Sequence, residues 1–436
     1  MHDLLAARGQ MAMSLGFHII FAVVGIGMPV LMVLAEWRWR RTGESVYLEL
    51  ARRWARGTAI LFAVGAVSGT VLSFELGLLW PRFMAFAGPV IGMPFSLEGF
   101  AFFTEAIFLG IYLYGWERVS RRAHLLAGVA VAVSGVASGI FVVMANAWMN
   151  TPAGFRMAAG RVVSVDPLAA LFNPAAFQQT LHMTLAAFVA TGFAVAGIHA
   201  ALLLRGPATP FHRAALGLAL LVAVPAAILQ PLSGDISARA VARQQPAKLA
   251  ALEALFTTTT GAPLTIGGLP DAADGTMRFG LRIPYGLSLL AFHDPAARVA
   301  GLDQVPRADW PPVAIVHLAF QAMVGLGTFL ALLSLVIAWR TWRRRPIAGS
   351  RGLLRAIAIA GPCGFLAIEA GWTVTEVGRQ PWIITGILRT RDAVTPMPGI
   401  ALPFALFTLL YIGLAAAVVW LLYRQIVRMP AAAPHG

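Results

Sequence analysis

The run "IAIAGPCGFLAIEAGWTV" occupies Ile357–Val374, and "TEVGRQPW" follows it at Thr375–Trp382. The first run is predominantly apolar, and it is long enough to cross the ~30 Å hydrocarbon core of a bilayer as a helix. The second run puts a carboxylate, Glu376, and a guanidinium, Arg379, at the end of that helix. Ionisable groups are costly at such a position and are functional candidates by default. The two runs together predict a membrane-spanning helix that ends in a binding site.

The rest of the chain repeats this apolar pattern. Of its 436 residues, 58% are hydrophobic and only 12% are charged, whereas a soluble protein of this length needs a more polar surface. We therefore predict a single all-α, polytopic membrane domain covering residues 1–436, with about nine spans. The expected spans lie near residues 17–35, 57–76, 95–115, 125–146, 180–204, 214–232, 313–338, 356–375 and 401–423.

The basic residues indicate an orientation in the membrane, not a nucleic-acid surface. The net charge is +14, but Lys and Arg gather in short loops such as "EWRWRR" and "WRTWRRR", with no basic face interleaved with aromatic residues. The positive-inside tendency then predicts an outer N-terminus and an inner C-terminus. The N-terminal stretch lacks the features of a cleaved signal peptide, so the first span is expected to be retained. The single cysteine, Cys363, excludes disulfides within the chain and clusters ligated by several cysteines.

Few ionisable side chains lie within the predicted spans. They are His18, Glu75, Glu98, Glu105, His182, His199 and Glu369, with Glu376 at a span end. The predicted orientation places five candidate ligands in the outer half of the membrane, namely His18, Glu98, His182, Met323 and Glu376. Histidine, methionine and carboxylate at similar depth form a haem ligand set more than a set for hard cations.

Other interpretations compete with a haem site. A lone histidine in a membrane helix is more often a helix–helix hydrogen-bonding residue, an interpretation that suits His199 and His317. A lone methionine such as Met323 more often fills a gap in a core. Composition and topology alone therefore leave a haem protein in competition with a proton- or ion-coupled transporter, whose membrane carboxylates would relay protons.

The longest predicted loop, residues 232–312, lies on the outer face between spans six and seven. It contains "PAKLAALEALF", an amphipathic stretch that carries Lys248 and Glu253. One interpretation is a surface helix with a pair of opposite charges. The other is a binding element, because a long loop beside buried ligands is commonly functional.

Eight motifs make the chain resemble, from end to end, the large haem-bearing subunit I of cytochrome bd-type quinol oxidases. They are "FHIIF" at Phe17, "SGTVLSFELG" at Ser68, "GMPFSLEGFAFFTEAIFLG" at Gly92, "NAWMNTP" at Asn146, "TLHMT" at Thr180, "KLAALEA" at Lys248, "FQAM" at Phe320 and "EAGWTVTEVGRQPW" at Glu369. They occur in the family's order, and "GRQPW" is the most specific of them.

The resemblance implies helix bundles that enclose three haems. His182 and Met323 are the expected axial ligands of a low-spin haem b. His18 and Glu376 are the expected ligands of two high-spin haems, a haem b and a haem d, and the resemblance leaves open which residue serves which haem. Glu98 is the expected carboxylate beside the O₂-binding haem.

The resemblance also implies routes for protons and quinol. Glu105 is the expected proton relay toward the cytoplasm, with Ser138 and Asn146 on the neighbouring span. Lys248 and Glu253 match the quinol-oxidising loop of the family.

The opening motif takes its meaning from the same resemblance. Glu376 would offer a carboxylate to iron, while Arg379 has a fork of donors suited to haem propionates or to that carboxylate. Trp372 lies one turn before Glu376 and is expected to pack on the macrocycle. Pro381 is expected to stop the helix, because proline has no N–H to continue it.

The implied activity is oxidation of ubiquinol or menaquinol at the outer face and reduction of O₂ to water at a high-spin di-haem centre. Proton-motive force would arise without a pump, because quinol protons leave outside and those used to make water come from inside. The implied location is the bacterial cytoplasmic (inner) membrane. The implied partner is a second membrane subunit in a heterodimer, with or without a small single-span peptide.

Two departures resemble the cyanide-insensitive branch of the family, in which a third haem b can replace haem d. The quinol loop is short, and Gln321 stands where many members have arginine. A positive charge near iron disfavours ferric haem. Neutral Gln321 is therefore expected to lower the reduction potential of the haem that Met323 would ligate.

Overall fold

The computed structural model describes residues 2–206 and 209–426. Within these residues, nine helices are long and apolar enough to cross a membrane, which confirms the predicted all-α polytopic class. They are α1 (His2–Thr42), α2 (Ser45–Leu79), α3 (Pro81–Tyr114), α4 (Arg121–Asn150), α6 (Ala176–Arg205), α7 (Pro210–Gln244), α10 (Val313–Trp342), α11 (Arg351–Val377) and α13 (Ala401–Ile426). The predicted orientation of the termini stays a prediction, and the C-terminus itself lies outside the described residues.

The helices are longer than the apolar runs that predicted them. The clearest case is α7, which continues to Gln244, so the segment before α10 begins at residue 245 and not at residue 232. Hydropathy marks only the part of a helix suited to lipid, whereas backbone hydrogen bonds continue past the membrane surface. Local signals still set the helix starts: Thr209 caps α7 by accepting from the His212 N–H, and Pro210 takes the first helical position.

Short elements fill the connections. The helical ones are α5 (Pro167–Leu171), α8 (Pro246–Leu252), α9 (Gly286–Phe292) and α12 (Thr390–Ala393). The strands are β1 (Phe155–Ala158), β2 (Arg161–Val165), β3 (Thr259–Thr260), β4 (Leu264–Ile266), β5 (Leu269–Asp271), β6 (Thr276–Arg278), β7 (Leu281–Ile283), β8 (Arg298–Val299), β9 (Trp382–Ile384) and β10 (Leu388–Arg389). They form two-stranded antiparallel ladders, β1–β2, β3–β8, β4–β7, β5–β6 and β9–β10.

The chain divides into two compact units. The first unit comprises residues 1–84, 99–138 and 394–436. The second unit comprises residues 85–98 and 139–393. The first therefore contains α1, α2 and α13, and the second contains α6, α7, α10 and α11 with the segment between α7 and α10.

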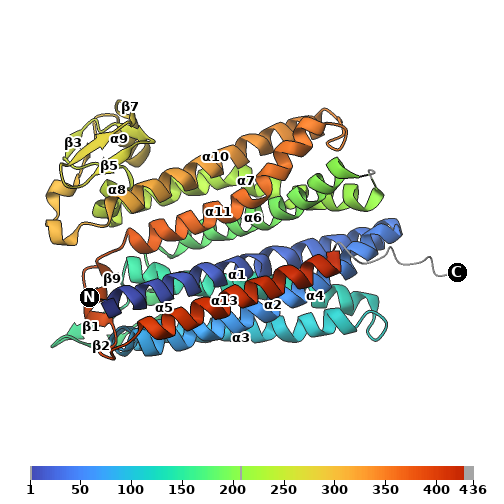
Figure 1. Cartoon of the computed structure of the whole chain (residues 1–436), viewed down its shortest axis with the longest axis horizontal. Coiled ribbons are helices and arrows are strands. Elements are labelled where there is room, and N and C mark those ends of the chain that lie inside the picture. Colours follow the sequence, from blue (N-terminus) through green and yellow to red (C-terminus); the bar gives the residue numbers. More distant parts are fainter. Residues whose placement is uncertain (1, 207–208, 427–436) are drawn as a thin grey trace. The chain divides into compact units, whose positions relative to one another are not determined.

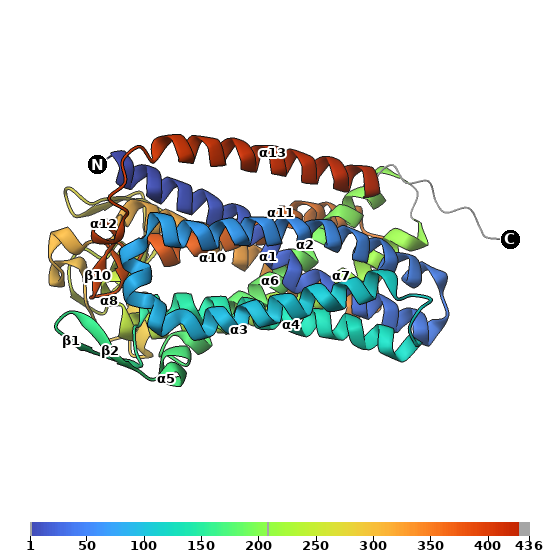
Figure 2. The ribbon, with the colours of Figure 1, turned by 90° about the horizontal axis from the view of Figure 1, so that it is seen from below.

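In the first unit α1 packs against α2, and α13 lies along α1 (Figure 2). Two aromatic pairs mark contacts between helices in this unit. Phe17 of α1 lies 4.6 Å from Tyr411 of α13 between ring centroids. Phe62 of α2 stacks on Phe102 of α3 at 5.1 Å. Packing of this kind holds α1, the helix that carries His18, against its neighbours.

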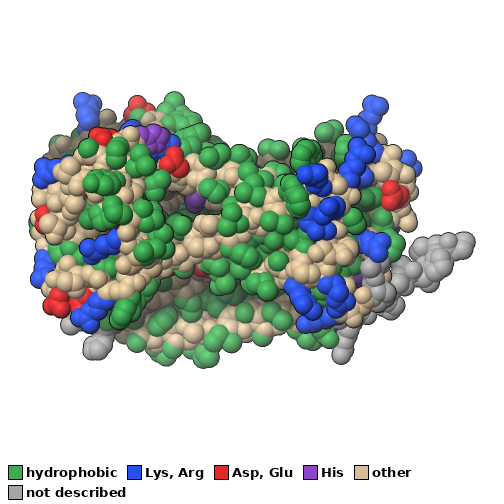
Figure 3. Space-filling view, turned by 90° about the horizontal axis from the view of Figure 1, so that it is seen from above, with side chains coloured by type: hydrophobic (Ala, Val, Ile, Leu, Met, Phe, Trp, Pro, Cys, Tyr) green, Lys and Arg blue, Asp and Glu red, His purple; other side chains and the backbone are tan. Residues whose placement is uncertain are grey.

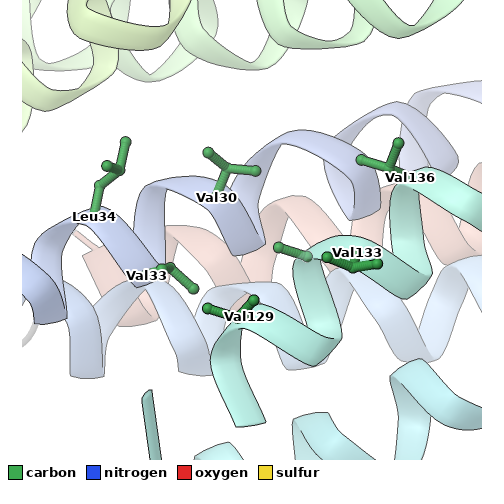
Figure 4. Close-up of a pocket in the computed structure, with 7 residues that line it drawn as sticks. Val30, Val33, Leu34, Val129, Val133 and Val136 are labelled. Atoms are coloured by element: carbon green, nitrogen blue, oxygen red, sulfur yellow. The ribbon is translucent and has the colours of Figure 1, made fainter. Parts of the chain in front are cut away.

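An apolar pocket of about 340 Å³ opens between α1 and α4 in the first unit. Figure 4 shows its valine and leucine lining, which includes Val30 and Leu34 from α1 and Val129 from α4. Every lining side chain is aliphatic, so the pocket offers no hydrogen-bonding or metal-ligating group. It contains none of the predicted site residues.

In the second unit α6, α7, α10 and α11 form a bundle (Figure 1). Its interior is aliphatic and aromatic, with Phe193, Leu330 and Ile357 almost fully buried.

On the face drawn in Figure 3, hydrophobic side chains cover the middle and Lys and Arg side chains gather toward the two ends. This is the distribution that helices need in a bilayer, where apolar side chains face the acyl chains and charged ones reach water.

Small residues let α6 and α11 approach each other closely. A Cβ atom at position 197 would lie 2.7 Å from Cα of Gly361, and one at position 364 would lie 2.5 Å from Cα of Ala190. Small residues at a helix interface permit backbone contact, which is a main source of association in membranes. We call Ala190, Gly197, Gly361 and Gly364 the glycine seam.

The glycine seam gives a stability prediction. Gly197→Val should lower the thermal unfolding midpoint of the purified protein, because overpacking of a tight interface costs about 1–3 kcal/mol. Gly217→Val is the matched control, since a Cβ at position 217 meets nothing within 4 Å. Equal midpoints for the two variants in detergent would show that the seam does not limit stability.

Candidate functional site

The histidine of the first unit is oriented by a serine. His18 Nδ1 lies 2.9 Å from Oγ of Ser68, and that hydroxyl donates to the Val64 carbonyl at 2.9 Å. Because the hydroxyl hydrogen is used, Ser68 Oγ accepts from the His18 Nδ1–H. Nε2 then carries the lone pair that a metal requires.

The histidine of the second unit is held in the same way. His182 Nδ1 lies 2.9 Å from Oγ of Ser233, whose hydroxyl donates to the Gln230 carbonyl at 2.8 Å. The Nε2 lone pair of His182 is therefore directed away from the serine, and the Gln230 amide nitrogen lies 3.1 Å from it. The contacts of both histidines fit the tautomer in which Nδ1 carries the proton and Nε2 carries the lone pair, as in a metal ligand.

Glycines leave space beside the predicted ligands. A Cβ atom at position 69 would lie 3.0 Å from Cε1 of His18. In the second unit, a Cβ at position 371 would lie 3.1 Å from Sδ of Met323, and one at position 234 would lie 3.7 Å from Cε1 of His182. A side chain at position 69 or 371 would crowd the ligand atoms, whereas the contact at position 234 is an ordinary one. The two glycines therefore let His18 and Met323 pack closely against the backbone of the neighbouring helix.

The opening motif forms a buried polar cluster. The carboxylate of Glu376 accepts from Arg379 at 2.5 Å through one oxygen and from the Asn146 amide through the other. Arg379 is 5% exposed, and its Nε and NH1 atoms have no hydrogen-bond partner within residues 2–206 and 209–426. A buried guanidinium with two unused donors fits an anionic group such as a haem propionate. Trp372 is half-buried one turn before Glu376 on α11.

The donor set fits haem better than a bare metal ion. Among the described residues, no group of three or more His, Cys, Asp or Glu side chains is placed to hold an ion. A porphyrin brings four nitrogen ligands of its own, so one or two protein ligands per iron suffice. His18, His182, Met323 and Glu376 meet that requirement.

Lys248 and Glu253 are buried, which differs from the surface-helix interpretation. They lie on α8 and at its end and are 5% and 4% exposed. Burial lowers the pKa of Lys248 to about 7, and the Arg379 cation acts in the same direction. Burial raises the pKa of Glu253 to about 7, although its carboxylate accepts from the Thr265 N–H. Two groups that titrate near neutral pH favour a functional role.

Two residues of α10 hold the segment that follows α8. His317 contacts the carbonyl oxygens of Leu252 and Gly267 through Nδ1 and Nε2, at 2.7 and 3.1 Å. Gln321 accepts from the Gly267 N–H and donates to the Thr265 carbonyl, both at 3.0 Å. His317 therefore joins α10 to the end of α8, which is the expected helix–helix contact, and also to the loop at Gly267. The amide of Gln321 binds the loop backbone, so its expected influence on iron stays a prediction.

The predicted proton residues divide between the units. Glu105 and Ser138 belong to the first unit, where a Cβ at position 135 would lie 3.3 Å from both Glu105 carboxylate oxygens. Glu98 and Asn146 belong to the second unit. Glu98 lies about two turns before Glu105 on α3, and it is half-buried, whereas Glu105 is buried.

Two further ionisable residues have structural partners. Glu75 accepts from Gln10 at 3.0 Å and Ser14 at 2.8 Å, which ties α2 to α1. His199 of α6 contacts His212 of α7 at 3.0 Å between Nδ1 atoms. This helix–helix contact is the expected one for His199.

Sequence reasoning missed the residues that orient the ligands. Ser68 and Ser233 lie 50 and 51 residues after their histidines, and a glycine follows each serine. This shared spacing was a readable signal. Asn150, in the quoted "NAWMNTP", is 1% exposed and binds Lys248.

Comparisons with known proteins identify the family of the chain. The sequence model of the family described as "Cytochrome bd terminal oxidase subunit I" matches residues 6–430. The solved bd oxidase from Geobacillus thermodenitrificans contains a chain with a TM-score of 0.92 and 40% identity, covering 98% of this chain and 99% of that one.

Curated relatives match over nearly their whole length. A Bacillus subtilis (strain 168) protein provisionally named cytochrome bd menaquinol oxidase subunit I is 39% identical, over 97% of this chain and 96% of its own. Cytochrome bd ubiquinol oxidase subunit 1 of the same strain is 32% identical, over 98% of this chain and 94% of its own.

Glu253 gives a pH prediction for the segment that follows α7. Its pKa is about 7 when folded and ordinarily 4.5, so its stabilising effect is full below pH 4.5 and is lost as pH rises through 7. The free energy of opening of α8, obtained from amide exchange corrected for intrinsic rates, should fall between pH 5 and 8. The decrease should be at most on the order of 3 kcal/mol. Glu253→Gln should stay nearly constant over that range. A decline of the same size in this variant would assign the effect to another group.

Proposed function

Because the chain belongs to the cytochrome bd terminal oxidase subunit I family, we propose that it oxidises membrane quinol and delivers the electrons through haem to O₂, which becomes water. The family match over residues 6–430 carries this proposal. The oriented lone pairs of His18 and His182 support it, because they are what haem iron would bind. The relatives named above are oxidase subunits, and none supports the transporter alternative.

His182 and Met323 would hold a low-spin haem b. Nε2 of His182 and Sδ of Met323 would be the ligand atoms, and the contact with Ser233 would keep the imidazole in its tautomer. A histidine–methionine pair suits electron transfer. Haem, when bound, supplies one-electron storage and, where one axial position stays open, the iron at which O₂ reacts.

His18 and Glu376 would each bind one high-spin haem. The Glu376 carboxylate is held by Asn146 and Arg379, and such partners restrict the orientation of a ligand. Arg379 has two further donors for a propionate, and Trp372 would pack on the macrocycle. Glu98 would lie beside the O₂-binding haem, which is either haem d or a third haem b.

Protons would reach the O₂ site from the cytoplasm through Glu105, with Ser138 and Asn146 as further polar stations. Glu105 is buried beside glycines, where an ionisable group is rare and usually functional. Water formation would then consume protons from inside while quinol releases them outside. Proton-motive force would arise without a pump.

Quinol would be oxidised at the segment that carries Lys248 and Glu253. A carboxyl group whose pKa is about 7 populates both protonation states near neutral pH. It can therefore take a proton from a quinol hydroxyl and release it again. Lys248 would hold the same helix in place.

The name subunit I implies a second subunit, and the nine candidate spans imply a multi-pass membrane protein. The finer assignment is a heterodimer in the bacterial cytoplasmic membrane, with or without a small single-span peptide. Ubiquinol and menaquinol both remain candidate substrates, since the two relatives differ in that part of their names.

The low-spin haem can be tested by spectroscopy. His182→Leu and Met323→Leu should each remove an axial ligand, so the low-spin signal should be lost or become high-spin in the reduced-minus-oxidised spectrum. His199→Leu, on the same helix, should keep the signal. A wild-type low-spin signal in both ligand variants would refute the assignment, and a wild-type protein without haem would refute the proposed function.

The proton relay can be tested by turnover. Glu105→Gln keeps the shape of the side chain but removes its titration, so quinol oxidase turnover should fall about 100-fold or more while haem content stays normal. Glu49→Gln is the control, because Glu49 forms an exposed ion pair with Arg53 on α2. Normal turnover in Glu105→Gln would exclude the relay, and loss of haem would make Glu105 structural.

A further inference from the structure

Three hydrogen bonds connect α8 to Glu376, and a fourth joins Glu376 to Arg379, which makes a chain of four bonds. Lys248 Nζ donates to Oδ1 of Asn150 at 2.6 Å, and Asn150 Nδ2 donates to Oδ1 of Asn146 at 3.2 Å. The Asn146 amide donates to one oxygen of Glu376, and Arg379 donates to the other. All five residues belong to the second unit.

The chemistry of the end groups fixes the direction of this chain. An ammonium group only donates, so Asn150 must present its carbonyl oxygen to Lys248 and its NH₂ group to Asn146. A carboxylate only accepts, so Asn146 must present its own NH₂ group to Glu376. Neither amide can flip without placing two donors or two acceptors against each other.

Asn150 is buried, and its side-chain amide contacts both the side chain and the backbone carbonyl of Asn146. It is 1% exposed, and its Nδ2 lies 3.0 Å from that carbonyl oxygen. Lys248 is also buried: a Cβ at position 378, two residues after Glu376, would lie 3.2 Å from its Cγ. Buried polar groups in such a chain are costly to leave unpaired.

We propose that Asn150 is a positioning residue that couples the placement of the quinol-loop helix α8 to the orientation of the Glu376 carboxylate. One side of its amide holds Lys248, and the other side holds Asn146 against Glu376. The proposal rests on the proposed function, because it assigns Glu376 to a haem and α8 to quinol. It places Lys248 in the support of the loop and leaves the contact with quinol to Glu253.

Two variants separate the two sides of the amide. Asn150→Leu removes both, so the Michaelis constant for quinol should rise and the spectrum and potential of the Glu376-ligated haem should shift. The kcat/KM should fall about 10-fold or more, as is usual when a group that orients a metal ligand is lost. Asn150→Asp keeps an acceptor for Lys248 but loses the donor to Asn146. It should shift the haem while the KM for quinol stays within about two-fold of wild type.

Thr151→Val is the matched control. Thr151 is the next residue on the chain, and its hydroxyl contacts the Ala147 carbonyl and Asn173, outside the four-bond chain. The control should keep wild-type haem spectra, potentials and KM. If it reproduces the Asn150→Leu phenotype, the effect is local stability and the proposal is wrong.

The outcomes distinguish the inference from the function on which it rests. Wild-type protein without haem or quinol oxidase activity would refute the function before any variant is compared. In active protein, a wild-type haem spectrum and potential in Asn150→Leu or Asn150→Asp would show that the chain does not reach Glu376. If Asn150→Leu does not accumulate, Asn150→Asp alone decides, because its Lys248 contact is retained.

Discussion

Water is absent from the hydrocarbon region, so each polar side chain there must find its hydrogen-bond partner within the protein. This constraint shapes the surroundings of the buried and half-buried carboxylates. Glu75 is paired with Gln10 and Ser14, and Glu376 is paired with Asn146 on one side. A ligand residue in such a protein is therefore part of a small network, and the network decides which of its atoms remains available for chemistry.

The two histidines show how hydrogen-bond partners select the atom that remains available. In each, a serine on the next helix accepts from Nδ1–H and donates its own hydrogen to a backbone carbonyl, so Nε2 is left with its lone pair. The same device occurs once in each unit, on α1 with α2 and on α6 with α7. Its separation along the chain is 50 residues for His18 and 51 for His182. The two units thus solve the problem of presenting an imidazole to a metal in the same way.

The sequence was sufficient for the spans, because apolar length is visible without a structure. Rare ionisable residues within the spans are visible in the same way, and the ligand roles assigned to them stay predictions. The sequence was insufficient for the partners, since Ser, Asn and Gln are common residues and their role depends on contacts across long separations. Gln321 illustrates the limit. It lies two residues from Met323, and residues two apart on a helix point about 200° apart. Its amide binds the backbone of residues 265 and 267, a contact that no pattern within α10 could indicate.

In the glycine seam, Gly197 of α6 and Gly361 of α11 lie at the point where the backbones of the two helices are in contact. His182 and Gly197 are fifteen residues apart on α6, and Gly361 and Glu376 are fifteen residues apart on α11. Each of these helix segments is therefore about 22 Å long, and the two segments meet where the backbones are in contact. A larger side chain at this contact would separate or tilt both helix segments. It would thereby displace His182 and Glu376, which it does not contact. The accuracy with which this protein presents its ligands thus depends on two residues that have no side chain at all.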